Sequence, residues 1–263
     1  MNVGIIGCGF IGTEIAQFID KGKDFKLIGL NDTNKSKAHI LIKKLKINKP
    51  ELMSLNDLIQ NSDLIIESAS KDIIQKLLQN KNLDKKNKKL LIMSTGGLVQ
   101  NLNLLNGVKN CEILLPSGAI SGLDAIKSVS GRIKSLTLTT TKTFKSLEGA
   151  PFIIKNNIKL NKTNKKILIF YGNLVDAVDG FPQNINVAAT LFLASKFENI
   201  TIKIIADPNT KFNIHEIIAT GDFGKISAIT QNLPSKNPRT SHLAVLSAIQ
   251  TIKNIKNNIK IGS

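Results

Sequence analysis

The 263-residue sequence predicts an α/β fold in which a domain with a parallel sheet is followed by a mixed α+β domain. Three observations carry this prediction. A glycine-rich segment near the start lies between a short apolar stretch and a helical pattern. Strand and helix patterns then alternate as far as Asp124. Beyond that residue, polar and apolar positions alternate as they do in antiparallel strands.

The composition is that of a globular protein, with 42% hydrophobic and 21% charged residues. No apolar run approaches the roughly 18 residues that a membrane span needs, so we expect no membrane partner. The N-terminus has no basic leader or cleavage site and predicts a first strand. Two cysteines, Cys8 and Cys111, are too few for a disulfide framework and favour a reducing cytoplasm.

The net charge of +17 raises the question of nucleic-acid binding. Only two of the basic residues are arginines, Arg132 and Arg239, although the planar arginine fork is the group best suited to reading nucleic acid. The lysines are scattered among asparagine and isoleucine. We therefore interpret the charge as solvated surface and expect no nucleic-acid partner.

The first element is a strand at residues 3–6, and it leads into the pattern G-x-G-x-x-G and then a helix. In this context the first glycine permits a tight turn, the second lets the backbone approach a pyrophosphate, and the third lets helix and strand pack closely. This arrangement predicts a Rossmann-type dinucleotide site. The predicted cofactor contacts here are Gly7, Gly9, Phe10, Ile11 and Gly12.

The second strand, FKLIGL, ends just before Asp32, which lies 20 residues after Gly12. An acid at this position is expected to bind the adenosine ribose hydroxyls. Thr33 stands where an arginine would favour a 2′-phosphate, so we predict NAD. Lys35 and Lys37 lie close by and leave NADP possible.

Further strand–helix units follow, and their loops should meet at the edge where a parallel sheet binds its ligand. Small residues there would let a nicotinamide approach the backbone. The predicted cofactor contacts in these loops are Ala69, Ser70, Thr95, Gly96 and Ala119. We assign the dinucleotide-binding domain to residues 1–118.

The catalytic and oligomerisation domain is assigned to residues 119–236. Its first strand is the threonine-rich segment SLTLTTTKTF, and such a strand would leave a polar sheet face or edge for a second subunit to cover. We therefore predict a homodimer or larger homo-oligomer. The segment 166–182 predicts a helix or strand leading to a turn, and 184–196 predicts a helix.

The later part of this domain predicts a strand at 199–208 and two more over 215–233, joined by a turn at Gly221-Asp222. A terminal helix over 237–256, capped by Thr240 or Ser241, is expected to pack back on the first domain.

Taken together, the motifs resemble the L-aspartate dehydrogenase family. The matching segments are VGIIGCGFIG (3–12), PSGAISGLDAI (116–126), TTTKTFKSLEGAPF (139–152), FPQNINVAATLFLA (181–194), ADPNTKFNIHEIIATGDFG (206–224) and NPRTSHLAVLSAI (237–249). The family interconverts aspartate and iminoaspartate, as in the first step of NAD synthesis in some prokaryotes. The resemblance implies that His215 is the catalytic histidine, that Ala119 contacts the cofactor, and that Asn186, preferred over Asn184, does the same.

Oxidation of an amino acid moves a hydride to the nicotinamide and also needs proton transfers at nitrogen. A histidine, whose ordinary pKa is about 6.5, suits those transfers. We expect His215 to follow a strand, with Asp207 or Glu216 orienting its second nitrogen. The other histidines, His39 and His242, are expected on surface helices.

The substrate of such a reaction carries two carboxylates and needs donors. The candidates are Ser121, Thr140, Lys142 and Asn184. We expect no metal site.

Two alternatives remain open: another two-domain reductase, resembling homoserine dehydrogenase or dihydrodipicolinate reductase, or a non-catalytic NAD-binding regulator that uses its basic surface on nucleic acid. The tandem histidine signature expected of those reductases is absent from the sequence.

Overall fold

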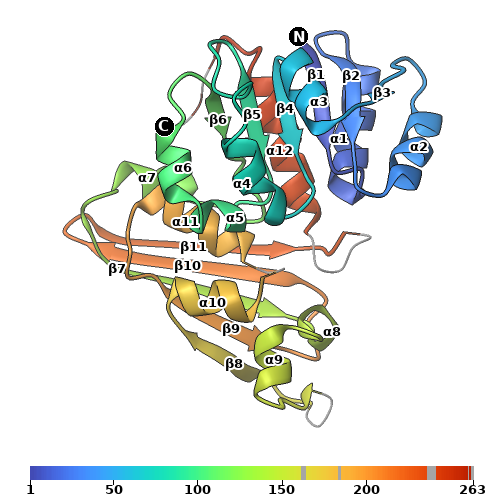
Figure 1. The fold of residues 1–263 in the computed structure, drawn as a ribbon. Coiled ribbons are helices and arrows are strands. Elements are labelled where there is room, and N and C mark those ends of the chain that lie inside the picture. Colours follow the sequence, from blue (N-terminus) through green and yellow to red (C-terminus); the bar gives the residue numbers. More distant parts are fainter. Residues whose placement is uncertain (161–163, 183–184, 236–240, 260, 262–263) are drawn as a thin grey trace. The chain divides into compact units, whose positions relative to one another are not determined.

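The chain forms two compact units (Figure 1), seen here in a computed structural model that describes all residues except 161–163, 183–184, 236–240, 260 and 262–263. Unit 1 consists of Met1–Pro116 and Val245–Asn258. Unit 2 consists of Ser117–Ala244 with Ile259–Ser263. The chain therefore leaves unit 1 after Pro116 and returns to it at Val245.

Unit 1 is built on a six-stranded sheet in which all paired strands run parallel. Its strands are β1 (Asn2–Ile6), β2 (Lys26–Asn31), β3 (Glu51–Leu52), β4 (Leu64–Glu67), β5 (Lys89–Ile92) and β6 (Glu112–Leu114). The order is β3-β2-β1-β4-β5-β6, so the direction of winding reverses between β1 and β4. Dinucleotides bind at such a reversal, and the predicted Rossmann-type domain is confirmed.

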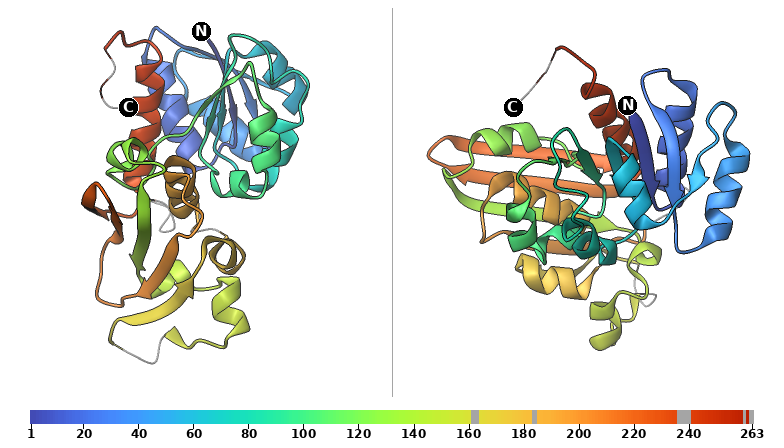
Figure 2. Two further views of the ribbon diagram at one scale, coloured as in Figure 1. Left: turned by 90° about the vertical axis from the view of Figure 1, so that its left-hand side faces the viewer. Right: turned by 45° about the horizontal axis from the view of Figure 1, so that its top comes forward.

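Helices lie on both faces of this sheet. They are α1 (Phe10–Lys21), α2 (Lys35–Lys44), α3 (Leu55–Asn61), α4 (Asp72–Leu78), α5 (Gly96–Val99), α6 (Leu102–Gly107) and α12 (His242–Asn254, within unit 1 from Val245 onward). Figure 2 shows α12 beside α1 on one face, and the Lys253 ammonium lies 5.5 Å from the centre of the Phe18 ring. Each helix in the described part of the chain is too short or too polar to cross a membrane.

Unit 2 is built on a five-stranded mixed sheet. Its strands are β7 (Ile133–Lys142), β8 (Ile167–Gly172), β9 (Thr201–Ala206), β10 (Asn213–Gly221) and β11 (Gly224–Asn232). The order is β11-β10-β7-β9-β8, and only the β7–β9 pair runs parallel. The predicted hairpin is present, and its turn residues are Asp222 and Phe223, one residue later than the predicted Gly221-Asp222. The threonine-rich strand β7 is the central strand, so the suggestion that it forms a sheet edge is wrong.

The helices that accompany this sheet in the described residues are α7 (Leu123–Ser128), α8 (Phe144–Leu147), α9 (Pro151–Lys155), α10 (Leu174–Gly180) and α11 (Asn186–Ser195). The segment 166–182, predicted as a helix or a strand, forms both: strand β8 and then helix α10. Figure 1 shows α9 and α10 over β8 and β9. There, Phe152 packs edge-on against Phe170 and beside Phe181, with ring centres 5.3 and 5.4 Å apart.

The two faces of the unit 2 sheet differ in burial, as the period-two alternation requires. One face carries buried side chains, among them Leu138, Ile204 and Ile217. The other, called here the open face, carries partly or fully exposed side chains. Its members include Thr137 and Thr139 of β7, Lys203 of β9, Ile214, Glu216 and Ile218 of β10, Ile229 of β11, and Leu168 and Tyr171 of β8.

Candidate active site

The glycine loop of unit 1 has one open position flanked by two crowded ones. A Cβ on Gly7, whose φ is +91°, would lie 2.7 Å from the Ala69 nitrogen, and a Cβ on Gly12 would overlap the Gly7 carbonyl oxygen. A Cβ on Gly9 would meet nothing within 4 Å. Gly7 and Gly12 are therefore fixed by packing, while the backbone at Gly9 borders open space, which the close approach of a pyrophosphate would require.

The N-terminus of α1 offers donors at the same place. Its N-cap, Gly9, has no side chain to accept a hydrogen bond, and the first intrahelical bond runs from the Thr13 nitrogen to the Gly9 carbonyl. The N–H groups of Phe10, Ile11 and Gly12 precede that bond, so they have no acceptor within the helix. Such a group of donors suits a phosphate anion.

Asp32 follows β2 and faces the glycine loop. Its Oδ2 accepts a hydrogen bond of 2.7 Å from the Cys8 nitrogen, and its Oδ1 accepts one of 2.7 Å from the Asn34 nitrogen. The carboxylate thus fixes the loop to the end of β2. Each oxygen still has one lone pair, the geometry needed for accepting hydrogen bonds from a ribose diol.

The remaining predicted residues of unit 1 lie in the loops after β4 and β5, at the same edge of the sheet as the glycine loop. Ala69 and Ser70 follow β4, whereas Thr95 and Gly96 follow β5 and lead into α5. Sequence reasoning missed the residue that joins these loops, Glu67, which is the last residue of β4 and fully buried. An acidic residue closing an otherwise apolar strand was the available signal.

In unit 2, His215 is the third residue of β10, within the strand rather than after it as expected. Its side chain is 2% exposed. Its Nδ1 lies 3.0 Å from the Thr140 hydroxyl oxygen, and the two residues are direct partners across the β10–β7 ladder. Thr140, predicted as a substrate contact, is therefore hydrogen-bonded to the histidine ring.

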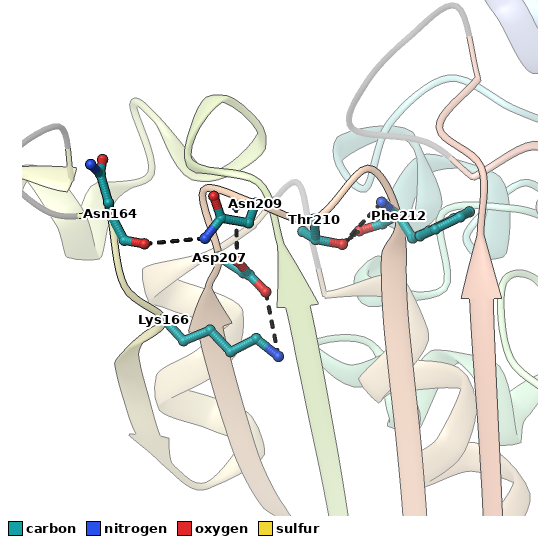
Figure 3. A network of polar contacts seen from close by, with 6 residues as sticks. All are labelled: Asn164, Lys166, Asp207, Asn209, Thr210 and Phe212. Carbon is teal, nitrogen blue, oxygen red and sulfur yellow. Dashed lines mark hydrogen bonds and ion pairs between the residues drawn. The ribbon is translucent and has the colours of Figure 1, made fainter.

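Neither acid proposed as the orienting group holds the ring of His215. Glu216 is the next residue of β10 and so points to the open face. The Asp207 carboxylate accepts a hydrogen bond of 2.9 Å from the Asn209 nitrogen and pairs with Lys166 at 3.4 Å (Figure 3). The expectation failed because strand alternation and a local Asx turn decide where these carboxylates lie.

Lys142 lies on the same face of β7 as Thr140, two residues farther along, and is 4% exposed. Burial lowers the pKa of Lys142 to about 8. Burial, and secondarily the charge of Lys142, lowers the pKa of His215 to about 3. At neutral pH the histidine is therefore an uncharged base beside an ammonium group.

The loop before α7 is held against β11 by side chains. The Ser121 nitrogen donates to the Thr230 hydroxyl at 3.1 Å, and the two hydroxyl oxygens lie 3.0 Å apart. The Asn232 amide donates to the Ala119 carbonyl at 2.8 Å. Thr230 is the partner of His215 on β11, so the loop before α7 reaches the part of the sheet that holds His215. We call Ser121, Thr140, Lys142, His215 and Thr230 the His215 cluster.

Sequence reasoning also missed Asn213, two residues before His215 on the same face. It is 1% exposed, and its Oδ1 is a buried acceptor without a hydrogen-bond partner. Of the predicted asparagines, Asn186 is the exposed first residue of α11, and Asn184 lies outside the described residues. His39 and His242 are exposed on α2 and α12, as predicted. The described residues hold no cluster of three or more His, Cys, Asp or Glu suited to a metal.

The comparisons with known proteins cover the whole chain. The family model "Homoserine dehydrogenase, NAD binding domain" matches residues 7–110, and "Aspartate dehydrogenase, C-terminal" matches residues 124–255. L-aspartate dehydrogenase of Methanosarcina mazei is 42% identical over 272 aligned residues, covering 100% of both chains. The chain belongs to the aspartate dehydrogenase family.

Other relatives in the aspartate dehydrogenase family agree with this assignment. The L-aspartate dehydrogenase of Nitrosopumilus maritimus is 40% identical, covering 100% of this chain and 99% of that one. The crystal structure of aspartate dehydrogenase from Thermotoga maritima superposes with a TM-score of 0.77 at 26% identity, covering 100% and 99%. The family segment 124–255 contains all of the His215 cluster except Ser121.

Proposed function

We propose that this protein oxidises L-aspartate to iminoaspartate with a nicotinamide dinucleotide, and catalyses the reverse reductive amination of oxaloacetate. The observation that carries the proposal is the His215 cluster, in which a buried neutral imidazole lies beside a buried ammonium group. The family assignment supports the substrate, because the full-length relatives are L-aspartate dehydrogenases. Neither a homoserine-type reductase nor a nucleic-acid-binding regulator is favoured.

In this proposal His215 moves the protons. The ring is uncharged at neutral pH, so it has a free nitrogen that can receive a proton from the substrate ammonium or from the water that hydrates the imine. This transfer requires a higher pKa of the ring, and a substrate carboxylate that neutralises the charge of Lys142 acts in that direction. Thr140 holds Nδ1, which leaves Nε2 as the reactive nitrogen. The bound dinucleotide supplies the hydride acceptor. In the amination direction the same ring returns the proton to the leaving hydroxyl.

Lys142 holds a substrate carboxylate in this proposal. Its ammonium is charged at neutral pH, and it is buried, so an ion pair formed there is little screened. The hydroxyl of Ser121 and the backbone of the loop before α7 add donors. Asn184 stays a proposed substrate contact, and Ala119 and Asn186 stay proposed cofactor contacts.

The proposed cofactor is NAD, held by the glycine loop, the N-terminus of α1 and Asp32, with Ala69, Ser70, Thr95 and Gly96 bordering its nicotinamide half. Asp32 supports NAD because a carboxylate accepts from ribose hydroxyls and repels a 2′-phosphate. Lys35 and Lys37 lie in the first turn of α2, just after Asp32, and keep NADP as the alternative. Asp32→Ala should weaken NAD binding and reduce the difference between the affinities for NAD and NADP. A wild-type protein that binds NADP at least as tightly as NAD would overturn the choice.

The deciding experiment follows NADH oxidation with oxaloacetate plus ammonia, and NAD reduction with L-aspartate. Activity with both, and none with homoserine, is the expected result. Activity with homoserine alone would favour the reductase alternative. Retention on DNA at physiological salt, with no dehydrogenase activity, would favour the regulator.

We also propose a homo-oligomer in the cytoplasm, where its product would feed NAD synthesis. The open face supports oligomerisation because three half-exposed or exposed isoleucines, Ile214, Ile218 and Ile229, lie on it with Leu168 and Tyr171. The two cysteines support a reducing compartment, since both are buried and unpaired.

A further inference from the structure

The carboxyl edge of the unit 1 sheet contains a buried carboxyl group, that of Glu67, to which the proposed function gives no role. Glu67 ends β4 and is 0% exposed. Its Oε1 accepts hydrogen bonds from the Ala69 nitrogen and the Ser94 hydroxyl, both at 2.8 Å. Its Oε2 accepts one from the Ser94 nitrogen at 2.9 Å. A single carboxyl group thus joins the loop after β4 to the loop after β5.

The neighbouring residue extends this connection to the glycine loop. Ser68 Oγ lies 2.9 Å from the Gly7 carbonyl oxygen and 3.2 Å from the Ile6 carbonyl oxygen, both of which can accept its hydrogen. The three loops after β1, β4 and β5 are therefore held as one edge. Asp32 fixes the far side of the glycine loop independently.

Burial disfavours the charged form of this carboxyl group, and its three hydrogen bonds only partly offset that effect. Burial raises the pKa of Glu67, while the bonds from Ser94 and Ala69 act in the opposite direction. A folded core alone would be served as well by an apolar residue at the end of β4. The carboxyl group lies between two loops that border the proposed cofactor site. This position explains why a carboxyl group, and not an apolar side chain, stands there.

We propose that Glu67 is a positioning residue for the dinucleotide. It holds the loops after β4 and β5 in the position that binds the nicotinamide half of the cofactor, whereas Asp32 lies on the adenosine side. The inference rests on the proposed cofactor site. In a sheet of this order the adenosine half lies on the β1–β2 side, so the β4 and β5 loops border the nicotinamide half. Glu67 touches only protein in this proposal and acts through Ala69 and Ser94.

The test is Glu67→Gln, measured by the binding of NADH and of ADP to the purified full-length protein. The amide has one acceptor and one donor group, whereas both carboxyl oxygens accept backbone N–H groups. Whichever way the amide turns, one backbone N–H, of Ala69 or of Ser94, faces an NH₂ group. The expected result is an NADH dissociation constant raised by about tenfold or more. The ADP constant should change by no more than about twofold, because ADP uses the Asp32 side.

Asp20→Asn is the matched control. Asp20, in the last turn of α1 at the opposite end of that helix from Gly9, is 4% exposed, and its two oxygens accept backbone N–H groups of Lys46, Ile47 and Asn48. The same donor conflict therefore arises, away from the carboxyl edge. Thermal unfolding of both variants measures the structural cost, and NADH and ADP affinities of Asp20→Asn should stay near wild type.

The outcomes separate this inference from the proposed function. If the wild-type protein does not bind NADH, the proposed cofactor site is wrong. A wild-type protein that binds NADH, with Glu67→Gln equal to it, overturns the role of Glu67 alone. Equal losses of NADH and ADP binding, or an NADH loss matched by Asp20→Asn at similar thermal stability, would show a general structural role and also overturn it. Glu67→Asp, which keeps two acceptors, should retain ADP binding and lose less NADH affinity than Glu67→Gln.

Discussion

At the scale of single residues, His215 carries the strongest expectation. Removing a general acid–base group costs about 10²–10⁴ in rate. His215→Ala should therefore lower kcat by that range with oxaloacetate and ammonia, while the NADH dissociation constant stays within about threefold of wild type by the same reasoning. Steady-state kinetics and fluorescence titration measure the two quantities. His39→Ala and His242→Ala, at exposed sites, serve as controls and should behave like wild type. A variant that keeps more than about half of wild-type kcat would make His215 structural.

The hydrogen bond between Thr140 and His215 gives a second expectation. Thr140→Val keeps the volume and shape of the side chain but removes the oxygen 3.0 Å from Nδ1. The ring then loses its fixed orientation, and we expect kcat to fall about tenfold, with KM changed less. The double variant with His215→Ala should be no slower than His215→Ala alone. A further loss in the double variant would mean that Thr140 contacts the substrate directly.

The lowered pKa of Lys142 makes binding of dicarboxylates depend on pH. The ammonium is charged below its pKa of about 8 and neutral above it, so an anion bound by it should dissociate more readily as pH rises through 8. Succinate, which lacks the amino group, is the suitable competitive inhibitor. Its inhibition constant should rise above pH 8 in wild type. In Lys142→Met it should be about tenfold or more higher at pH 7 and independent of pH. If the succinate inhibition constant of the wild-type protein stays the same up to pH 9.5, Lys142 does not bind the carboxylate.

The packing roles of Gly7 and Gly12 were predictable from the sequence because they depend on local backbone geometry. Gly7 and Gly12 are forced by close packing, and the strand–loop–helix context makes that visible without coordinates. The orienting partner of His215 was predicted wrongly because it comes from a strand 75 residues away. Sequence proximity favours Asp207 and Glu216, but pairing across the sheet decides the contact. The same holds for Glu67, whose partners become evident only once β4 and β5 are paired.

At the scale of elements, Asp20 shows how one carboxylate fixes a connection between a helix and a strand. Burial raises the pKa of Asp20, but hydrogen bonds from Asn48, Lys46 and Ile47 outweigh it and hold the pKa at about 2. Since the folded-state pKa lies below the unfolded value of 3.8, the carboxylate stabilises the fold above about pH 4, and this contribution is lost as the pH falls through 2.

Asp20→Asn should therefore be less stable than wild type by about 1–3 kcal/mol at pH 7, because one backbone N–H loses its acceptor. Urea unfolding followed at pH 7, 5, 4 and 3 measures the difference. The gap between the two proteins should be constant from pH 7 to 5 and begin to narrow below about pH 4. A gap that stays the same at pH 3 would mean that the charge of Asp20 contributes nothing and only its shape matters.

The elements themselves were largely predictable because hydrophobic periodicity is a local property. The parallel sheet, the β10–β11 hairpin and helices α1, α11 and α12 follow the patterns of their own segments. The position of β7 within its sheet was not predictable, since strand order depends on pairing between distant segments. The short strand β3, with two residues, carries too little pattern to be recognised.

At the scale of the whole molecule, the open face of unit 2 predicts self-association. Ile229 and Tyr171, from the two outer strands of the sheet, are 58% and 66% exposed. If a second copy covers this face, Ile229→Lys places a charge in the contact. The variant should then sediment as a monomer at micromolar concentration, where wild type sediments as a dimer or larger. Lys225→Ala, on the same strand and face near the turn, is the control. A wild-type protein that sediments as a monomer would contradict the prediction.

The return of the chain to unit 1 has a consequence for how the protein is made. Val245, Ala248 and Ile252 of α12 are buried, and that helix lies beside α1. Residues 1–116 therefore leave the ribosome with an apolar stripe uncovered, and the segment that covers it is synthesised after the whole of residues 117–244. At typical rates of translation that delay is roughly 6 to 25 s. During this interval the nascent unit 1 exposes apolar surface that the finished chain covers, and such surface favours aggregation.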